Sequence, residues 1–312
     1  MLSIHQPNPI RIATALAATA LVAAFGIPHI ALGQSQNQFS EPVYRVANET
    51  PAQAVATLPT SPAQSTLATT LQAPFDLTQQ PGEHPLAPVI RVCKASLAHI
   101  EQDVHDYSCT LVKHERIEGE LGENQHIFLK ARHDPFSVYM QFLQPYQGRE
   151  VLFVDGQHDN EMLVLEAGWK RKMLGKMQLD PEGMVAMRGQ KHPITQVGLK
   201  NLLTELITRI EADCQFAECE VTSAADKAVN GRSATMIQIL HPVPRQNFRA
   251  HIARIFFDNE LKVPIHYDSF LWPEQPGGHP PLEESYTYTN LKLNNGFTSR
   301  DFDADNPEIF KL

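Results

Sequence analysis

The chain has 312 residues, and its 26 Lys or Arg against 35 Asp or Glu give a formal net charge of -9. Such a chain has no general electrostatic attraction for phosphate backbones or anionic lipid surfaces, whose binding depends on dense Lys and Arg. This composition argues against nucleic acid as a partner.

Residues 1–33 have the pattern of a secretory signal peptide. Arg11 is their only formal charge, an uncharged Ala-rich run follows over residues 12–27, and small residues stand before and at Gly33. The run is shorter than the roughly 20 residues that a membrane-spanning helix needs, which argues against a permanent anchor. We therefore expect cleavage near Gly33 and an exported, periplasmic protein with no stable transmembrane segment.

Residues 34–83 consist mainly of Gln, Ser, Thr, Ala and Pro, with few charges and few large apolar residues. Such a segment cannot bury enough apolar surface to offset the entropy of ordering its backbone. We expect a disordered linker here and one folded domain over residues 84–312, which is long enough for a single sheet-based core.

The folded part is expected to begin with a helix at Pro88, because apolar residues recur every three or four positions up to Val104. A second amphipathic helix is expected over residues 199–210. Between the two lies a Met-rich segment, residues 169–189, whose adaptable side chains suit either core filling or a mobile cover over an apolar surface.

Period-two alternation predicts about nine strands. The clearest case follows Pro135, where Phe136, Val138, Met140 and Phe142 share one face. The predicted strands cover residues 107–117, 126–132, 136–143, 150–155, 162–166, 233–240, 252–258, 263–272 and 285–293. Hairpin connections, such as Asn230-Gly231, favour an α+β fold with a large curled antiparallel sheet and helices on its concave side. Such a sheet either packs solid or leaves an apolar cavity.

The four cysteines, Cys93, Cys109, Cys214 and Cys219, are disulfide candidates in an exported chain. Their spacing gives no paired C-x-x-C knuckles, which argues against zinc. The pairs we expect are Cys93 with Cys109 and Cys214 with Cys219, with free buried thiols as the alternative.

Several short sequences resemble an uncharacterised family of exported bacterial proteins over residues 100–310. They are PFSVYM (135–140), GREVLFV (148–154), KHPI (191–194), FLWP (270–273) and ESYTY (284–288). The element order is also similar to that of the LolA-like outer-membrane lipoprotein carriers. That resemblance implies a half-open β-barrel covered by helices, which holds acyl chains in its hollow. It also implies an arginine latch between sheet and lid. Arg149 is the candidate, and an ordinary ion pair with Glu150 or a neighbour is the alternative.

No motif for a hydrolase, a zinc protease or a phosphate-binding loop is found in the sequence. His114 and Glu115 are neighbours on a predicted strand and therefore face opposite sides, and His192 precedes a proline at a helix entrance. The alternating acids at Asp301, Asp303 and Asp305 lack the glycine and distal glutamate of a calcium loop. We expect no cofactor, no metal and no catalysis.

These observations favour a non-catalytic carrier or binding protein for a lipid or a lipoprotein acyl chain. The alternatives are a solid scaffold that binds another envelope protein and, less favoured, an enzyme whose site has no local motif. Clustered His and carboxylate side chains in one deep cleft would favour the enzyme. The expected cavity wall consists of Phe136, Val138, Met140, Phe142, Val151, Phe153, Trp169, Tyr267, Trp272, Tyr286 and Tyr288.

Overall fold

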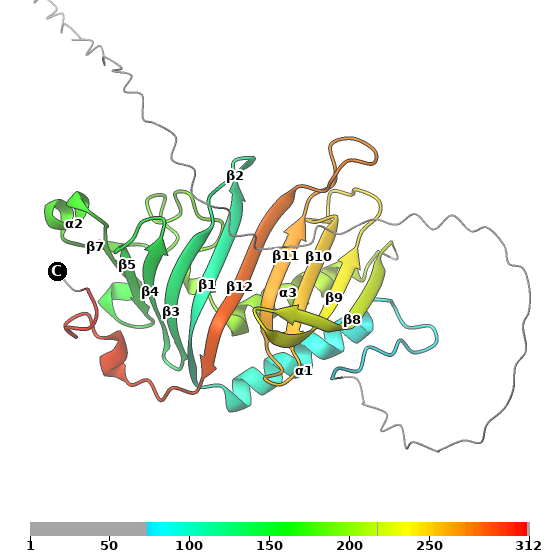
Figure 1. Cartoon of the computed structure of the whole chain (residues 1–312), viewed down its shortest axis with the longest axis horizontal. Helices are drawn as coiled ribbons and strands as arrows, with labels where there is room; N and C mark the ends of the chain where they lie inside the picture. The colour runs from blue at the N-terminus through cyan, green and yellow to red at the C-terminus, as the bar shows by residue number, and fades with distance from the viewer. Residues whose placement is uncertain (1–73, 217, 311–312) are drawn as a thin grey trace, which may run out of the picture. The chain divides into compact units, whose positions relative to one another are not determined.

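The computed structural model describes residues 74–216 and 218–310, which form a curled, open antiparallel sheet with helices (Figure 1). The expected signal peptide and residues 34–73 of the expected linker lie outside the described residues. Residues 74–83 of that linker pack on the domain. The Phe75 ring lies 5.3 Å from the Phe257 ring, and Arg91 donates a hydrogen bond to the Thr78 carbonyl oxygen. Within the described ranges, no helix is long and apolar enough to cross a membrane.

Twelve strands form the sheet, in the order β7-β6-β5-β4-β3-β1-β12-β11-β10-β9-β8, with β2 paired to β1 alone. Two meanders meet at the centre, where Tyr107 of β1 lies opposite Leu293 of β12. The strands are β1 (Asp106–Ile117), β2 (Glu120–Leu121), β3 (Gln125–His133), β4 (Phe136–Gln144), β5 (Glu150–Val154), β6 (Met162–Leu165), β7 (Lys176–Leu179), β8 (Glu220–Val229), β9 (Arg232–Leu240), β10 (Ile252–Asp258), β11 (Pro264–Phe270) and β12 (Leu282–Leu293).

Between β7 and β8 the chain crosses from one edge of the sheet to the other. The crossing consists of residues 180–198, which we call the covering segment, and helix α3 (Leu199–Asp213). Leu203, Leu206 and Ile207 of α3 are buried in the same hydrophobic core as one face of the sheet. The crossing therefore places both elements over that face, which we call the inner face.

Helix α1 (Ala87–Asp103) covers the inner face together with α3, against which it packs. It has a proline in its first turn and buries the predicted stripe that includes Val89, Cys93 and Ile100. Pro88 suits the first turn because its missing N–H has no partner there in any helix. Both predicted long helices are confirmed.

The opposite, outer face of β4 to β6 is covered by the end of the chain. Tyr139, Leu152 and Leu165 belong to a second core with Phe302 and Phe310. Alternation thus places Tyr139 and Met140 in different cores, as period-two geometry requires. The acids near the carboxyl terminus stabilise local turns there: Asp301 forms a capping box with Thr298.

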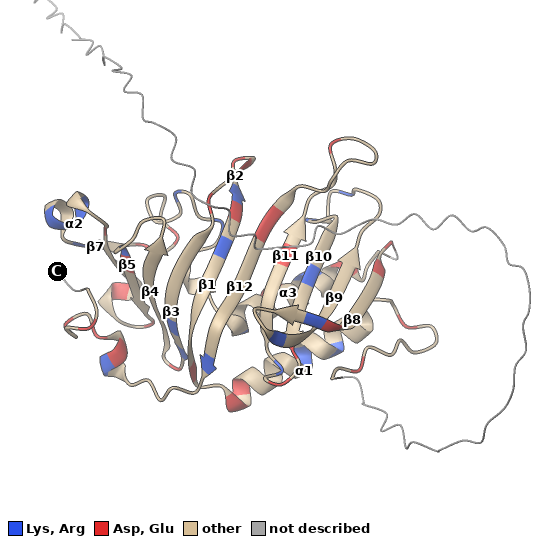
Figure 2. Cartoon of the chain, viewed as in Figure 1, with Lys and Arg blue, Asp and Glu red and all other residues tan. Residues whose placement is uncertain are grey.

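The short helix α2 (Trp169–Leu174) stands at the β7 edge of the sheet and is rich in basic residues (Figure 2). Arg171 anchors it, because its guanidinium donates hydrogen bonds to the Gly148 carbonyl oxygen at 2.7 Å and to Glu150 Oε1 at 3.1 Å. Glu150 is 2% exposed and also accepts a hydrogen bond from the Tyr139 hydroxyl. The inward Arg171 leaves the other side of α2 facing solvent.

The nine predicted strands are all present, and three further strands were missed. β2 has only two residues, and β7 lies inside the Met-rich segment, where no alternation is clear. β8 is an edge strand of small and charged residues, so its exposed pattern carries little apolar signal. The predicted turn at Asn230-Gly231 is confirmed, with φ of 48° and 80°, the left-handed values that a type I′ hairpin turn needs.

Neither expected disulfide is present, because all four cysteines are free thiols. Cys93 and Cys109 are buried in the main core, where each packs as a small apolar side chain. Burial raises the pKa of Cys93 to about 12 and that of Cys219 to about 11. Such thiols are poor nucleophiles, since thiolate is the reactive form.

Candidate functional site

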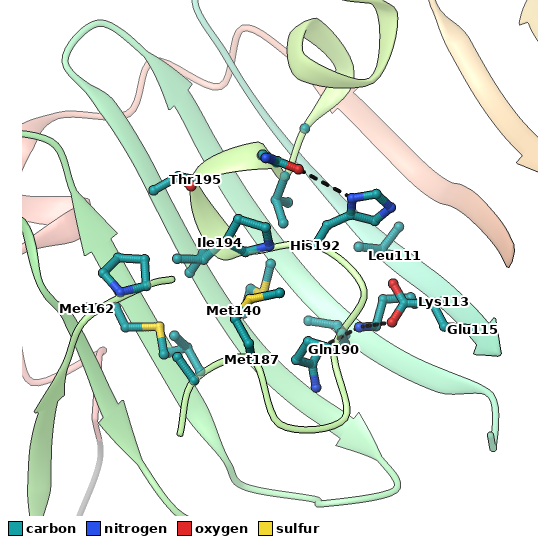
Figure 3. Close-up of a pocket in the computed structure, with 18 of the residues that line it drawn as sticks. Leu111, Lys113, Glu115, Met140, Met162, Met187, Gln190, His192, Ile194 and Thr195 are labelled. Atoms are coloured by element: carbon teal, nitrogen blue, oxygen red, sulfur yellow. Dashed lines mark hydrogen bonds and ion pairs between the residues drawn. The ribbon is translucent and has the colours of Figure 1, made fainter. Parts of the chain in front are cut away.

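A cavity of about 900 Å³ lies between the inner face and the crossing segments. Ligand pockets typically have volumes of roughly 300–1,000 Å³, so this cavity is large enough for a sizeable ligand. Its floor comes from β1, β3 to β7, β11 and β12, and its roof comes from the covering segment and α3. Figure 3 shows methionines toward one end and charged or polar side chains toward the other.

The apolar end consists of inner-face side chains from five strands. They alternate with the outer-face residues that the carboxyl-terminal segment covers, so they point into the cavity. They are Leu111, Ile127, Met140, Phe142, Val151, Met162 and Val164. Each is less than 9% exposed, because walls and roof shield this end from solvent.

The covering segment supplies the opposite wall. Ala186 and Met187 line the cavity from this side, and Ile194 lies in the short helix η2 (Ile194–Gln196) that leads into α3. Of the four methionines in the Met-rich segment, Met177 and Met187 are half-buried at the cavity. Met173 and Met184 are 62% and 89% exposed. The methionines of the Met-rich segment are therefore divided between the cavity and the surface, and core filling accounts for only part of them.

The polar end centres on two buried carboxylates. Glu115 on β1 accepts hydrogen bonds from Lys113 Nζ at 3.0 Å and from the Tyr286 hydroxyl at 2.8 Å. The same hydroxyl lies 3.2 Å from Glu284 Oε2. Burial and the negative charges of Glu284 and Glu115 raise the pKa of Tyr286, so the phenol keeps its proton. Its single hydrogen lies between two carboxylates.

Glu284 on β12 carries the second set of contacts. Its Oε2 lies 3.1 Å from His192 Nε2, and Arg209 Nη1 of α3 lies 3.8 Å from Oε1. The hydrogen bond with Glu284 raises the pKa of His192 despite the opposing effect of burial. Burial by itself would raise the pKa of Glu284, but the His192 hydrogen bond and the nearby positive charges outweigh it and lower that pKa.

These contacts tether the covering segment to the sheet. The Lys191 backbone N–H donates to Glu115 Oε2 at 3.2 Å, and the Lys191 side chain pairs with Glu283. Lys113 of β1 also donates to the Gln190 side-chain oxygen, as Figure 3 shows. Residues 190–192 are thus held to β1 and β12 at the polar end.

Six residues of the predicted wall line the cavity, namely Met140, Phe142, Val151, Tyr267, Tyr286 and Tyr288. Five do not. Phe136, Val138 and Phe153 lie on the predicted face but pack in the core, with the Phe136 and Phe153 rings 6.0 Å apart. Trp169 is 69% exposed on α2, and Trp272 Nε1 donates to the His241 carbonyl oxygen. Alternation identifies a face of a strand, whereas position along the strand decides whether the residue meets the cavity.

Arg149 lines the cavity and pairs with Glu166 of the loop after β6, with Nη2 to Oε2 at 2.9 Å. Its guanidinium also lies 4.4 Å from the centre of the Tyr146 ring. A latch would need a contact between Arg149 and the covering segment. The contacts described here join Arg149 to Glu166 and Tyr146, which lie outside that segment. Glu150, the other expected partner, pairs with Arg171.

The polar end contains residues that the sequence interpretation set aside. From the sequence, His192 is placed only before a proline at a helix entrance, and Glu115 is considered only beside His114. His114 faces away and lies within hydrogen-bond distance of the Gly122 carbonyl oxygen. Lys113 and Glu115 are two apart on β1 and therefore share the inner face. The other inner-face positions of β1, such as Cys109 and Leu111, are apolar. A charged pair among them could have indicated from the sequence that this end of the inner face is polar.

This end contains His and carboxylates in one cleft, which is the condition stated above for an enzyme, so its chemistry has to be considered. His192 Nδ1 lies 3.3 Å from Gln196 Oε1, and Nε2 lies 3.1 Å from Glu284 Oε2, so both ring nitrogens have partners within the protein. An imidazole whose two ring nitrogens are both engaged has no free nitrogen to accept a proton from a substrate. No group of three His, Cys, Asp or Glu suited to a metal occurs among residues 74–216 and 218–310.

Comparison with known proteins places the chain in a family. A model described as "Protein of unknown function (DUF1571)" matches residues 104–310, about two thirds of the sequence. The chain belongs to the DUF1571 family. This match confirms the resemblance to an uncharacterised family, and no curated protein matches the sequence.

Solved structures that are similar to this chain include three from bacteria. A putative outer membrane lipoprotein-sorting protein domain from Vibrio parahaemolyticus is 10% identical over 69% of this chain and 96% of that chain, with a TM-score of 0.33. Lipoprotein LppX from Mycobacterium tuberculosis is 12% identical over 70% and 100%, with a TM-score of 0.40. A LolA superfamily protein from Nitrosomonas europaea is 6% identical over 69% and 98%, with a TM-score of 0.29. Similarity at this level carries no conclusion about function.

Proposed function

We propose that this protein is a non-catalytic, exported carrier or binding protein for the acyl chain of a lipid or lipoprotein. The observation that carries the proposal is the cavity of about 900 Å³, which is apolar at one end and charged at the other. An acyl chain attached to a polar group has the same two-part character. Export rests on the signal-peptide pattern of residues 1–33.

The apolar end would supply the binding free energy. Each methylene removed from water contributes about 0.8 kcal/mol. The side chains of the apolar end offer hydrocarbon and thioether surface, namely Leu111, Ile127, Met140, Phe142, Val151, Met162 and Val164. The shape of this surface sets no exact chain length, since methionine side chains adapt to what they contact. Met140, Met162 and Met187 all border it.

The polar end would fix the ligand's orientation. Lys113 and Arg209 are cationic donors whose carboxylate partners, Glu115 and Glu284, are buried. A polar or anionic group of the ligand would find donors here without leaving a buried charge unpaired, which would be costly. The engaged state of His192 supports binding over catalysis.

The experiment is native mass spectrometry of protein isolated gently after export, followed by organic extraction of any bound mass. In parallel, delipidated protein is titrated with a fluorescent fatty acid. We expect a stoichiometric acyl species and probe binding at micromolar concentration. An empty protein that also refuses the probe contradicts the proposal and favours a scaffold that binds another envelope protein.

A matched pair of variants locates the binding. Val164→Phe places a ring in the cavity, and Val243→Phe places the same ring on the surface, where Val243 is 46% exposed. Displacing two ligand methylenes should weaken probe binding by about tenfold, since each contributes about 0.8 kcal/mol. Equal affinity in both variants contradicts binding in this cavity.

A further inference from the structure

Two stretches that border the cavity, one in α2 and one in the covering segment, carry the most exposed large apolar side chains among the described residues. Trp169 and Met184 adjoin Lys170 and Val185, which line the cavity, and we call these stretches its rim. Trp169, Met184 and Val185 are 69%, 89% and 70% exposed, and Met173 follows at 62%. Met173 and Val185 also line the cavity. Isolated exposed apolar residues need no explanation, but a group at the mouth of a pocket marks an interaction surface.

The same rim is basic although the whole chain is acidic. Residues 169–191 contain six Lys or Arg and two Asp or Glu, whereas the full sequence has a net charge of -9. Lys170 and Lys172 of α2 are exposed and form no ion pair within the described residues. The general argument against anionic surfaces, which rests on the net charge of the whole chain, therefore does not apply to this rim.

The structure of α2 presents these groups outward. Arg171 holds the helix to Gly148 and Glu150, so its neighbours Lys170 and Lys172 flank an inward anchor. Trp169 and Met173 are four residues apart and share one side of the helix. A tryptophan with adjacent lysines is the combination that prefers the boundary between lipid headgroups and acyl chains.

We propose that the rim patch, defined as Trp169, Lys170, Lys172, Met173, Met184 and Val185, docks the protein on an anionic lipid bilayer. Trp169, Met184 and Val185 enter the headgroup boundary, and the lysines contact anionic headgroups. Docking places the mouth of the cavity against the membrane. The role in ligand exchange rests on the proposed function, but membrane docking itself does not.

The test uses the full protein and empty vesicles, so it requires no ligand. A Trp272→Phe background leaves Trp169 as the only tryptophan of the two in the sequence. Vesicles of phosphatidylethanolamine with phosphatidylglycerol should shift Trp169 emission to the blue, and brominated lipid should quench it. Vesicles of phosphatidylcholine alone should bind at least about tenfold more weakly.

Variants outside the cavity wall separate docking from ligand uptake. Lys172→Glu changes the patch charge by two and should weaken binding to anionic vesicles by about thirtyfold, whereas Lys292→Glu, an exposed lysine on β12, should not. Trp169→Ser and Met184→Ser should each weaken it by about tenfold, with Val243→Ser as their control. All these variants share one amino terminus, so residues 1–73 contribute equally to each.

The outcomes are distinct. Loss of vesicle binding in Trp169→Ser with intact uptake of the fatty-acid probe from solution supports the docking patch. A wild-type protein that takes up the probe but ignores anionic vesicles overturns docking and leaves the carrier proposal standing. Vesicle binding without a change in Trp169 emission also overturns it, because another surface is then in contact. A crosslinker at position 172 that recovers only an acidic envelope protein overturns it in favour of a protein partner.

Discussion

The two faces of β4 to β6 are built from the same strands yet have different roles. On the outer face, Leu152, Val154 and Leu165 are packed beneath Phe302 and Phe310 of the carboxyl-terminal segment. On the inner face, Val151 and Val164 border a cavity of about 900 Å³. Neighbouring residues of one strand therefore meet either a close-packed core or a hollow. The difference lies in what the distant parts of the chain place above each face.

The largest expected difference between the faces comes from removing a phenylalanine. Phe302→Ala removes a ring that is 1% exposed on the outer face and should lower the free energy of unfolding by about 3–5 kcal/mol. Phe142→Ala on the inner face should lower it by only about 1–3 kcal/mol, because that ring already borders empty space. Urea unfolding of both variants measures this. Equal losses would mean that the inner face is as closely packed as the outer face.

A smaller and opposite contrast comes from adding volume within the same two faces. Val154→Phe forces a ring into the packed outer face and should destabilise by about 1–3 kcal/mol. Val164→Phe enters the cavity and should change stability by less than about 1 kcal/mol. Thermal unfolding of the two variants, compared at the same pH, measures the difference. A marked destabilisation by Val164→Phe contradicts an open cavity.

The smallest expected effect is a pH dependence at the polar end of the inner face. His192 has a raised pKa, so its contribution is complete below its ordinary value of 6.5 and is lost as pH rises through the raised value. Glu284 has a lowered pKa, so its contribution is complete above its ordinary value of 4.5 and is lost as pH falls through the lowered value. The tether of the covering segment is therefore strongest between these ordinary values.

Hydrogen exchange measures this tether directly. After correction for the intrinsic pH dependence of exchange, amides of residues 190–198 should be a few fold more protected at about pH 6 than at about pH 9. Amides of β5, which pair on both sides, should show no such change. His192→Gln should remove the pH dependence of the covering segment, and an unchanged profile would contradict the His192–Glu284 tether.

Strand β4 shows which features of the fold could be predicted from the sequence and which could not. The alternation of Val138, Met140 and Phe142 correctly gave a strand and its inner face, because side-chain direction is set by local backbone geometry. The same alternation could not show that Val138 packs in the core whereas Met140 lines the cavity. Both side chains point the same way, and only the elements above them differ.

The residues of the polar end of the cavity could not be grouped from the sequence either. Glu115, His192 and Glu284 come from β1, the covering segment and β12, and their contacts span 92 and 171 positions in the chain. No local motif connects them. The Cys93 and Cys109 pair illustrates the converse error, since an even number of cysteines in an exported chain suggested disulfides that the structure does not contain.

Local sequence was enough to predict the two long helices, nine strands, the hairpin turn at Asn230-Gly231 and the apolar faces, because these follow from periodicity and turn chemistry over a few residues. Tertiary structure alone decided that the chain crosses the sheet after β7, that this crossing leaves a cavity, and that charged side chains close one end of it. A cavity is a property of the space between elements. Its existence depends on long-range packing, to which no single segment of sequence is sensitive.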